Sequence, residues 1–115
     1  MKQNPMKSLL MVVLLAGALA AGSPATAADT AKIGVMFSTT GPGAVIGVGQ
    51  MEGAKMAVEE INKAGGVSIG GKKMKLEGIY RDDETNPQVA VGRFKEIVKD
   101  QGATALVGGT FGNVS

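Results

Sequence analysis

Glycine and hydroxyl residues gather in one loop, and their spacing limits the chemistry that the sequence could carry. Residues 37–62 read FSTTGPGAVIGVGQMEGAKMAVEEIN, where a glycine-studded loop follows an apolar run and leads into an amphipathic segment. Glycine-rich loops before a helix often hold phosphates on backbone N–H groups. Gly41, Gly43 and Gly47 give the pattern G-x-G-x-x-x-G, which is close to the dinucleotide fingerprint.

Other features of the same loop disfavour a dinucleotide site. The first glycine comes several residues after the apolar run rather than at its end, and Pro42 lacks an N–H that could bind phosphate. An acidic residue for the ribose is expected about 20 residues on. Glu59 and Glu60 fall inside the expected helix instead, so nucleotide binding is not the favoured interpretation.

The sequence offers little for catalysis. It contains no His and no Cys, so a Ser-His or Cys-His pair cannot form within it. The hydroxyls of Ser38 to Thr40 have no visible base to activate them. Asp82 to Glu84 could bind a cation, but we interpret these acids as residues that solvate a loop and favour the start of the next helix. We therefore expect no catalytic residue, no metal and no cofactor.

Capture of a small solute fits the loop residues better. Neutral hydrogen-bonding groups and a few apolar side chains recur in two loops, and this mixture is typical of sites that bind without chemistry. The N–H groups at the start of the first helix would favour a carboxylate. The polar residues are Ser38, Thr39, Thr40, Thr110 and Asn113, and the apolar ones are Val45, Ile46 and Phe111.

Periodicity predicts alternating strands and helices after residue 28. Strand-like apolar runs cover residues 32–37, 73–82 and 103–109, the second nearer a sheet edge and the third of a buried type. Amphipathic helices are expected over residues 48–64 and from Pro87, capped by Asn86, to about residue 101. Residues 68–73 read as a turn, and Gly53 would let the first helix pack closely on the sheet.

The order β-α-β-α-β predicts an α/β fold, half of a doubly wound parallel sheet. In that topology the first strand lies between the other two. Ligands bind at the switch point outside the carboxyl ends of the strands. Residues 38–49 and 110–115 border that point, so the glycine-rich loop becomes one wall of the predicted site.

The N-terminus predicts export. A basic start with Lys2 and Lys7, a short apolar run and small residues at Ala25 and Ala27 are typical of a secretory signal peptide over residues 1–27. Without Cys there is no lipid-acceptor residue, so we expect a free periplasmic protein. Removing both lysines cancels the net charge of +2, so the basic balance does not predict nucleic-acid binding.

Several motifs after residue 31 carry a family resemblance. They are S-x-x-G-P at 38–42, G-x-x-x-A-x-x-E-I-N at 53–62, A-G-G at 64–66, D-D-x-x-x-P-x-x-A-V at 82–91 and T-F-G-N-V-S at 110–115. Together they resemble the N-terminal lobe of type I periplasmic binding proteins. More narrowly, the segment is similar to the leucine/isoleucine/valine-binding group of ABC-transporter solute receptors.

The resemblance implies a fold of two lobes that close on a ligand between them. Residues 28–115 would form part of the first lobe, with the second lobe missing. The residues implied in ligand binding are Ser38, Thr40, Gly41, Ile46, Thr110, Phe111, Gly112 and Asn113. Gly112 stands where many members carry a serine, so one hydroxyl contact to a carboxylate would be absent.

The implied partners are a small amino acid or related carboxylate or amide, and the subunits of an ABC permease. Contact with the membrane would come only through the permease and during export. The ligand itself stays open among aliphatic amino acids, amides, urea-like solutes and aromatic acids. A sensory or regulatory ligand-binding domain of the same fold is the alternative function.

Overall fold

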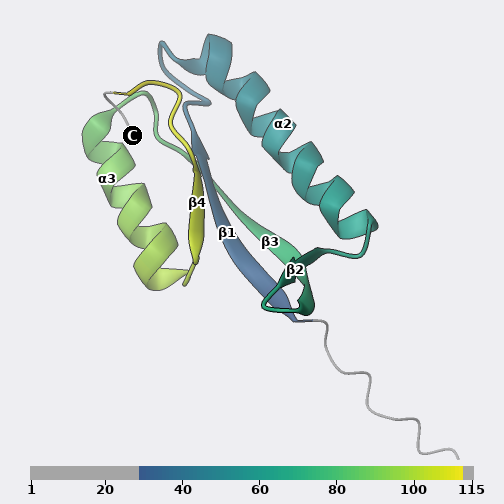
Figure 1. The fold of residues 1–115 in the computed structure, drawn as a ribbon. Coiled ribbons are helices and arrows are strands. Elements are labelled where there is room, and N and C mark those ends of the chain that lie inside the picture. The colour runs from purple at the N-terminus through teal and green to yellow at the C-terminus, as the bar shows by residue number, and fades with distance from the viewer. Residues whose placement is uncertain (1–28, 113–115) are drawn as a thin grey trace, which may run out of the picture.

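The computed structural model describes residues 29–112, so the predicted signal peptide and the predicted ligand contact Asn113 lie outside the described residues. Within them, strands and helices alternate along the chain (Figure 1). The elements are β1 (Thr30–Phe37), α2 (Ala44–Lys63), β2 (Val67–Ile69), β3 (Lys72–Asp82), α3 (Pro87–Lys95), the π-helix η1 (Glu96–Asp100) and β4 (Ala105–Gly108).

The sheet confirms the doubly wound topology. Its strand order is β2-β3-β1-β4, and β1 runs parallel to both β3 and β4. The first strand therefore lies between the other two parallel strands, as the doubly wound topology predicts. With both neighbours parallel to β1, the carboxyl ends of these strands meet at one edge of the sheet.

The short strand β2 was not predicted, because residues 68–73 were interpreted as a turn only. Val67 to Ile69 pairs antiparallel with the start of β3. Gly70 and Gly71 connect the two strands with φ angles of 58° and 79°. A glycine pair with positive φ at both positions matches the twist of a tight hairpin, so this stretch forms a hairpin and covers the free edge of β3.

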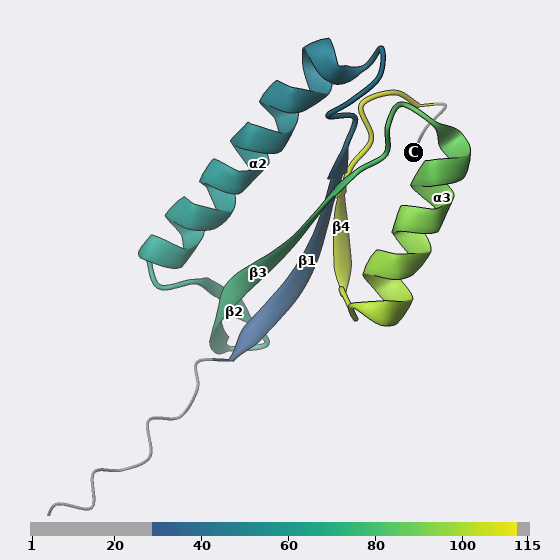
Figure 2. The same cartoon turned by 180° about the vertical axis from the view of Figure 1, so that it is seen from behind.

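Helices cover both faces of the sheet, with α2 on one side and α3 with η1 on the other (Figures 1 and 2). Alternate residues of β1 consequently enter different cores, since successive side chains of a strand point to opposite faces. On the α2 side Val35 and Phe37 pack with Met51. On the other side the core consists of Met36, Ile79, Ala90, Ile97 and Ala103.

The start of α3 could be predicted from its own residues, whereas the start of α2 could not. The Asn86 side chain accepts hydrogen bonds from the backbone of Gln88 and Val89 at 2.9 and 3.2 Å, and Pro87 is the first helical residue, as predicted. By contrast, α2 begins at Ala44, four residues before the expected start at residue 48, and its N-cap Gly43 makes no side-chain cap. The Gly43 N–H bonds Thr85 instead, a partner remote in sequence.

Two further expectations about packing are wrong. Gly53 is exposed, and a Cβ at that position would meet no atom of the described chain within 4 Å, so it does not bring α2 close to the sheet. Strand β4 has a buried-type sequence, yet Leu106 and Val107 are 36% and 45% exposed. The exposure arises because β4 is the last strand in the order of the described sheet, with no neighbouring strand on its outer side.

Among residues 29–112, the helices are too short or too polar for any of them to span a membrane.

Candidate functional site

The loops that follow β1 and β4 meet at the switch point of the sheet, as predicted. The Ser38 N–H donates to the Thr110 hydroxyl at 3.0 Å, and the Gly109 N–H donates to the Met36 carbonyl at 3.0 Å. The Phe111 ring lies against Gly43, since a Cβ there would be 2.8 Å from ring atom Cε2. Thus the two predicted walls of the site are in direct contact (Figure 1).

Ser38 lies beneath this junction rather than on its surface. Its side chain is fully buried, and its hydroxyl donates to Asp83 Oδ1 at 2.6 Å. Because the Ser38 N–H is also paired with Thr110, both donors of this residue are used within the protein. The predicted ligand contact at Ser38 therefore occupies a supporting position.

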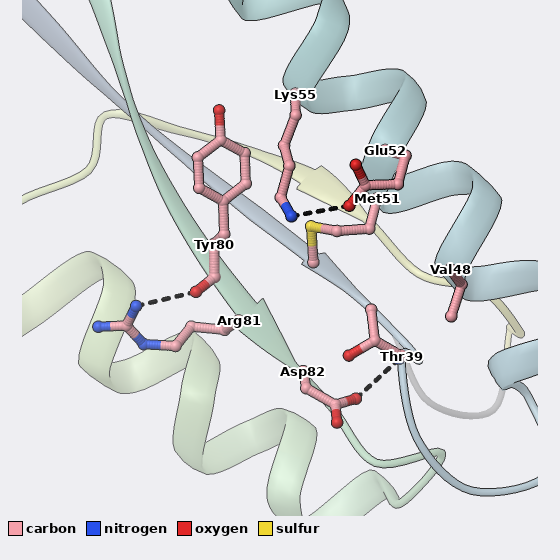
Figure 3. A pocket seen from close by; sticks show the side chains of 8 residues that line it. All are labelled: Thr39, Val48, Met51, Glu52, Lys55, Tyr80, Arg81 and Asp82. Carbon is pink, nitrogen blue, oxygen red and sulfur yellow. Dashed lines mark hydrogen bonds and ion pairs between the residues drawn. The ribbon is translucent and has the colours of Figure 1, made fainter.

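Thr40 is exposed, and its donors are also paired. Its hydroxyl donates to Asp82 Oδ2 at 2.6 Å, and its N–H donates to Asp82 Oδ1 at 3.3 Å. The Thr39 N–H donates to the same Oδ1 at 2.8 Å (Figure 3). Burial raises the pKa of Asp82, but hydrogen bonds from the Thr40 hydroxyl and nearby backbone N–H groups outweigh it and hold the pKa below its usual value.

Gly41 and Gly43 allow the β1–α2 loop to lie against the β3–α3 loop. Gly41 has a φ of 74°, and a Cβ there would be 2.7 Å from the carbonyl oxygen of Glu84. The Thr85 hydroxyl accepts from the Gly43 N–H and donates to the Thr40 carbonyl, both at 2.9 Å. The two glycines therefore allow the β1–α2 and β3–α3 loops to pack closely against each other.

Glu84 and Thr85 hold backbone angles that are unusual for residues with side chains. Their φ values are 57° and 56°, in the left-handed region. Such conformations persist where surrounding contacts determine them, and they concentrate at functional sites. The Thr85 N–H donates to Asp83 Oδ1 at 2.9 Å, and the Glu84 N–H donates to Asp82 Oδ1 at 2.8 Å.

The acidic residues after β3 are the site residues that the sequence interpretation missed. They were expected to solvate a loop, and this is wrong for Asp83, which is 0% exposed. The available signal was their place at the carboxyl end of a strand parallel to β1. Within residues 29–112, no group of three or more acidic side chains could hold a metal ion. The partners of Asp82 and Asp83 are hydroxyl and backbone donors.

Few backbone donors of the two loops remain for a ligand. At the start of α2, the Ala44 N–H bonds the Gly41 carbonyl at 3.1 Å, and the Ile46 N–H bonds the Gly43 carbonyl at 3.0 Å. Within the described part of the chain, the unpaired N–H groups of these loops include Gly41, Val45, Thr110 and Gly112. Apolar side chains stand nearby, with Val45 exposed at 88% and both Ile46 and Phe111 exposed.

A separate hollow of about 310 Å³ lies between α2 and β3 (Figure 3). Its two charged residues on α2 pair with each other, since Lys55 Nζ lies 2.8 Å from Glu52 Oε1. Lys55 also lies 5.8 Å from the centre of the Tyr80 ring. Among residues 29–112, no predicted ligand residue lines this hollow, whose walls are Thr39, Val48, Met51, Glu52, Lys55, Tyr80, Arg81 and Asp82.

An ion-pair network joins β3 to α3 and η1, on the face of the sheet that these two helices cover. Arg81 donates to Glu96 Oε1 through Nε at 2.8 Å and through Nη2 at 2.6 Å. This hydrogen bonding raises the pKa of Arg81 and lowers that of Glu96. Arg93 adds contacts to Glu96 at 3.4 Å and to Glu84 at 3.9 Å, so the network reaches the loop that follows Asp82 at the end of β3.

Residues 30–115 match the family described as periplasmic binding protein. The chain belongs to that family. The periplasmic binding protein segment is 45% identical over 82 residues to the leucine-, isoleucine-, valine-, threonine-, and alanine-binding protein of Pseudomonas aeruginosa. That alignment covers 71% of this chain and 21% of the relative, so the segment spans about a fifth of that protein.

Solved structures share the fold of this periplasmic binding protein segment. The branched-chain amino acid transporter substrate binding protein LivJ from Streptococcus pneumoniae, in complex with isoleucine, superposes with a TM-score of 0.67 and 32% identity, over 75% of this chain and 24% of LivJ. A second structure is a solute binding protein of an ABC transporter from Rhodopseudomonas palustris BisB5, in complex with 3,4-dihydroxy benzoic acid. It superposes with a TM-score of 0.50 and 26% identity, over 68% of this chain and 20% of that protein. The α/β fold is therefore that of two-lobed periplasmic binding proteins.

Proposed function

We propose that the protein is an extracytoplasmic receptor that captures a small amino acid or related carboxylate and delivers it to an ABC import permease. The observation that carries the proposal is the junction of the β1–α2 and β4 loops, where Ser38 bonds Thr110 at 3.0 Å. Unpaired N–H groups and exposed apolar side chains lie at this junction. This is the mixture that a small amphipathic solute requires.

The ligand carboxylate is assigned to the β4 loop, Thr110 to Asn113. The N–H groups of Thr110 and Gly112 have no partner within the described residues, which leaves them available to an anion. Ile46 and Phe111 supply apolar contact. Gly41 offers one further N–H, whereas Ser38 and Thr40 hold the loop in place, because their donors are paired within the protein.

The rest of the receptor follows the same proposal. Residues 1–27 act as a cleaved signal peptide that sends the protein to the periplasm, and residues 28–115 form part of the first lobe. A second lobe would supply the contacts to the ligand's amino group. Capture and delivery need no chemistry, so the receptor is not an enzyme and works without a cofactor.

A thermal-shift titration of the full-length protein tests this function. The panel contains leucine, isoleucine, other amino acids, amides, aromatic carboxylates and NAD. A ligand at about 100 times its Kd stabilises the folded state by about 2.7 kcal/mol. We expect a shift with one class of carboxylate and none with NAD. A shift with NAD alone would overturn the proposal, because the glycine-rich loop would then be a nucleotide site.

Gly112→Ser is expected to tighten carboxylate binding about tenfold without loss of stability. A Cβ at Gly112 would meet no atom of residues 29–112 within 4 Å, so the change fits the described part of the loop. A hydrogen bond to a charged group contributes about 1.5–3 kcal/mol, and 1.4 kcal/mol corresponds to a factor of ten. Isothermal titration with the ligand found in the panel measures the change, and Gly112→Ala is the matched control. Equal affinities for the two variants would contradict a carboxylate at this loop.

A further inference from the structure

We propose that Asp82 is a positioning residue for ligand binding, which fixes the β1–α2 loop in its binding shape before the ligand arrives. The inference rests on the proposed function and adds a residue that sequence interpretation left to solvent. Asp82 ends β3, whereas the loop that it holds follows β1. Its carboxylate therefore joins the ends of two parallel strands.

The carboxylate of Asp82 is saturated by the loops themselves. Oδ1 accepts the N–H groups of Thr39 at 2.8 Å, Thr40 at 3.3 Å and Glu84 at 2.8 Å. Oδ2 accepts the Thr40 hydroxyl at 2.6 Å. Four donors already surround the carboxylate, so we infer that its effect on binding comes through the loop. Figure 3 shows the bond from Thr39.

The bonds to Asp82 also determine which N–H and hydroxyl groups of the β1–α2 loop remain available to a ligand. Donors of Thr39 and Thr40 that would otherwise be free for a ligand are turned toward Asp82. The Gly41 N–H, between Thr40 and Pro42, keeps no partner within the described residues. Asp82 thereby selects the donors that the site presents.

Preorganisation is the physical reason why this affects affinity. A loop that is already fixed does not lose conformational freedom when the ligand binds, so more of the contact energy appears as affinity. Charged hydrogen bonds are about twice as strong as neutral ones, which makes a carboxylate an effective anchor for N–H groups. The anchored loop also carries the exposed side chain of Ile46, at the start of α2.

The test compares Asp82→Ala and Asp82→Asn with Asn62→Ala in the full-length protein. Asn62 is the matched control because its side chain also bonds backbone groups, the Leu76 N–H at 2.7 Å and the Leu76 carbonyl at 2.8 Å. These bonds lie between the end of α2 and the first half of β3, away from the loop. Each alanine variant removes hydrogen bonds, but only Asp82→Ala releases the loop.

We expect Asp82→Ala to weaken ligand binding about tenfold, the equivalent of 1.4 kcal/mol. Asp82→Asn keeps an acceptor oxygen for the N–H groups, and we expect a loss of about threefold because neutral bonds are weaker. Asn62→Ala should bind within about twofold of wild type, since it leaves the loop bonds intact. Hydrogen exchange in the ligand-free protein should quicken over residues 38–43 in both Asp82 variants and stay unchanged in Asn62→Ala.

The outcomes separate this inference from the function on which it rests. Wild-type protein that binds no member of the panel overturns the proposed function, and the inference with it. Wild-type protein that binds, with both Asp82 variants binding equally well and exchanging at the wild-type rate, overturns the inference alone. If Asp82→Ala does not fold, Asp82→Asn decides between these results by the same two measurements.

Discussion

Gly47→Ala is expected to lower the free energy of unfolding by about 3 kcal/mol, at the upper end of the usual cost of overpacking. A Cβ at Gly47 would overlap the carbonyl oxygen of Ser38 and lie 2.6 Å from its carbonyl carbon. Both atoms belong to the backbone, so no side chain can rotate away to make room. The loop after β1 would have to move, and with it the bonds from Ser38 to Thr110 and Asp83.

Gly53→Ala is the matched control on the same helix. A Cβ there would meet no atom within 4 Å. Alanine is favoured over glycine inside a helix by about 1 kcal/mol, so this variant should be as stable as wild type or more so. Urea unfolding of the full-length protein, followed by circular dichroism, measures both changes. Equal midpoints for the two variants would mean that the close contact at Gly47 does not exist.

Most of the fold could be predicted because its signals are local. The apolar run of β1, the apolar spacing of α2 and the Asn86-Pro87 start of α3 each depend on neighbouring residues. The order of those elements, with right-handed crossovers in a doubly wound sheet, then places the first strand between the other two parallel strands. The switch point and the two loops beside it follow from that arrangement, and their contact is confirmed by the bond from Ser38 to Thr110.

The errors concern partners that are remote in sequence. Periodicity cannot tell which glycine of α2 faces another backbone, so Gly53 was chosen where Gly47 makes the contact. Likewise α2 begins at Ala44, next to Gly43, whose N–H donates to Thr85, 42 positions further along the chain. By contrast, the pair Gly70-Gly71 is a local signal for a two-residue hairpin turn, so the strand β2 could have been predicted from the sequence.

The candidate site shows the same division between local and remote information. Hydroxyl residues in the β1–α2 loop were correctly placed at the switch point, but their orientation depends on two acids that arrive 42 to 45 positions later. A cluster of acids in a loop is typical of a solvated surface. Only the tertiary pairing of β1 with β3 turns Asp82 and Asp83 toward Ser38 and Thr40.

Asp83→Ala should cost about 2–4 kcal/mol in the free energy of unfolding. The side chain is 0% exposed, and its Oδ1 accepts the Ser38 hydroxyl at 2.6 Å and the Thr85 N–H at 2.9 Å. Removing the acceptor leaves the buried Ser38 hydroxyl unpaired, at a cost of about 1–3 kcal/mol, and the part-buried Thr85 N–H unpaired, at about 1 kcal/mol because water can reach it. Thr85 would also lose a contact that holds its φ of 56°.

Glu84→Ala is the control for that change, because the neighbouring acid is exposed and its one ion pair among residues 29–112 is a 3.9 Å contact to Arg93. Exposed pairs contribute about 0–1 kcal/mol, so the unfolding midpoint should change little. Asp83→Asn keeps one oxygen that can accept the Ser38 and Thr85 bonds. Its NH₂ group replaces Oδ2, which is buried without a hydrogen-bond partner in the described chain. Its stability should fall between the two alanine variants. If Asp83→Ala were as mild as Glu84→Ala, the carboxylate would not hold the two loops together, and the acids after β3 would be a solvated surface after all.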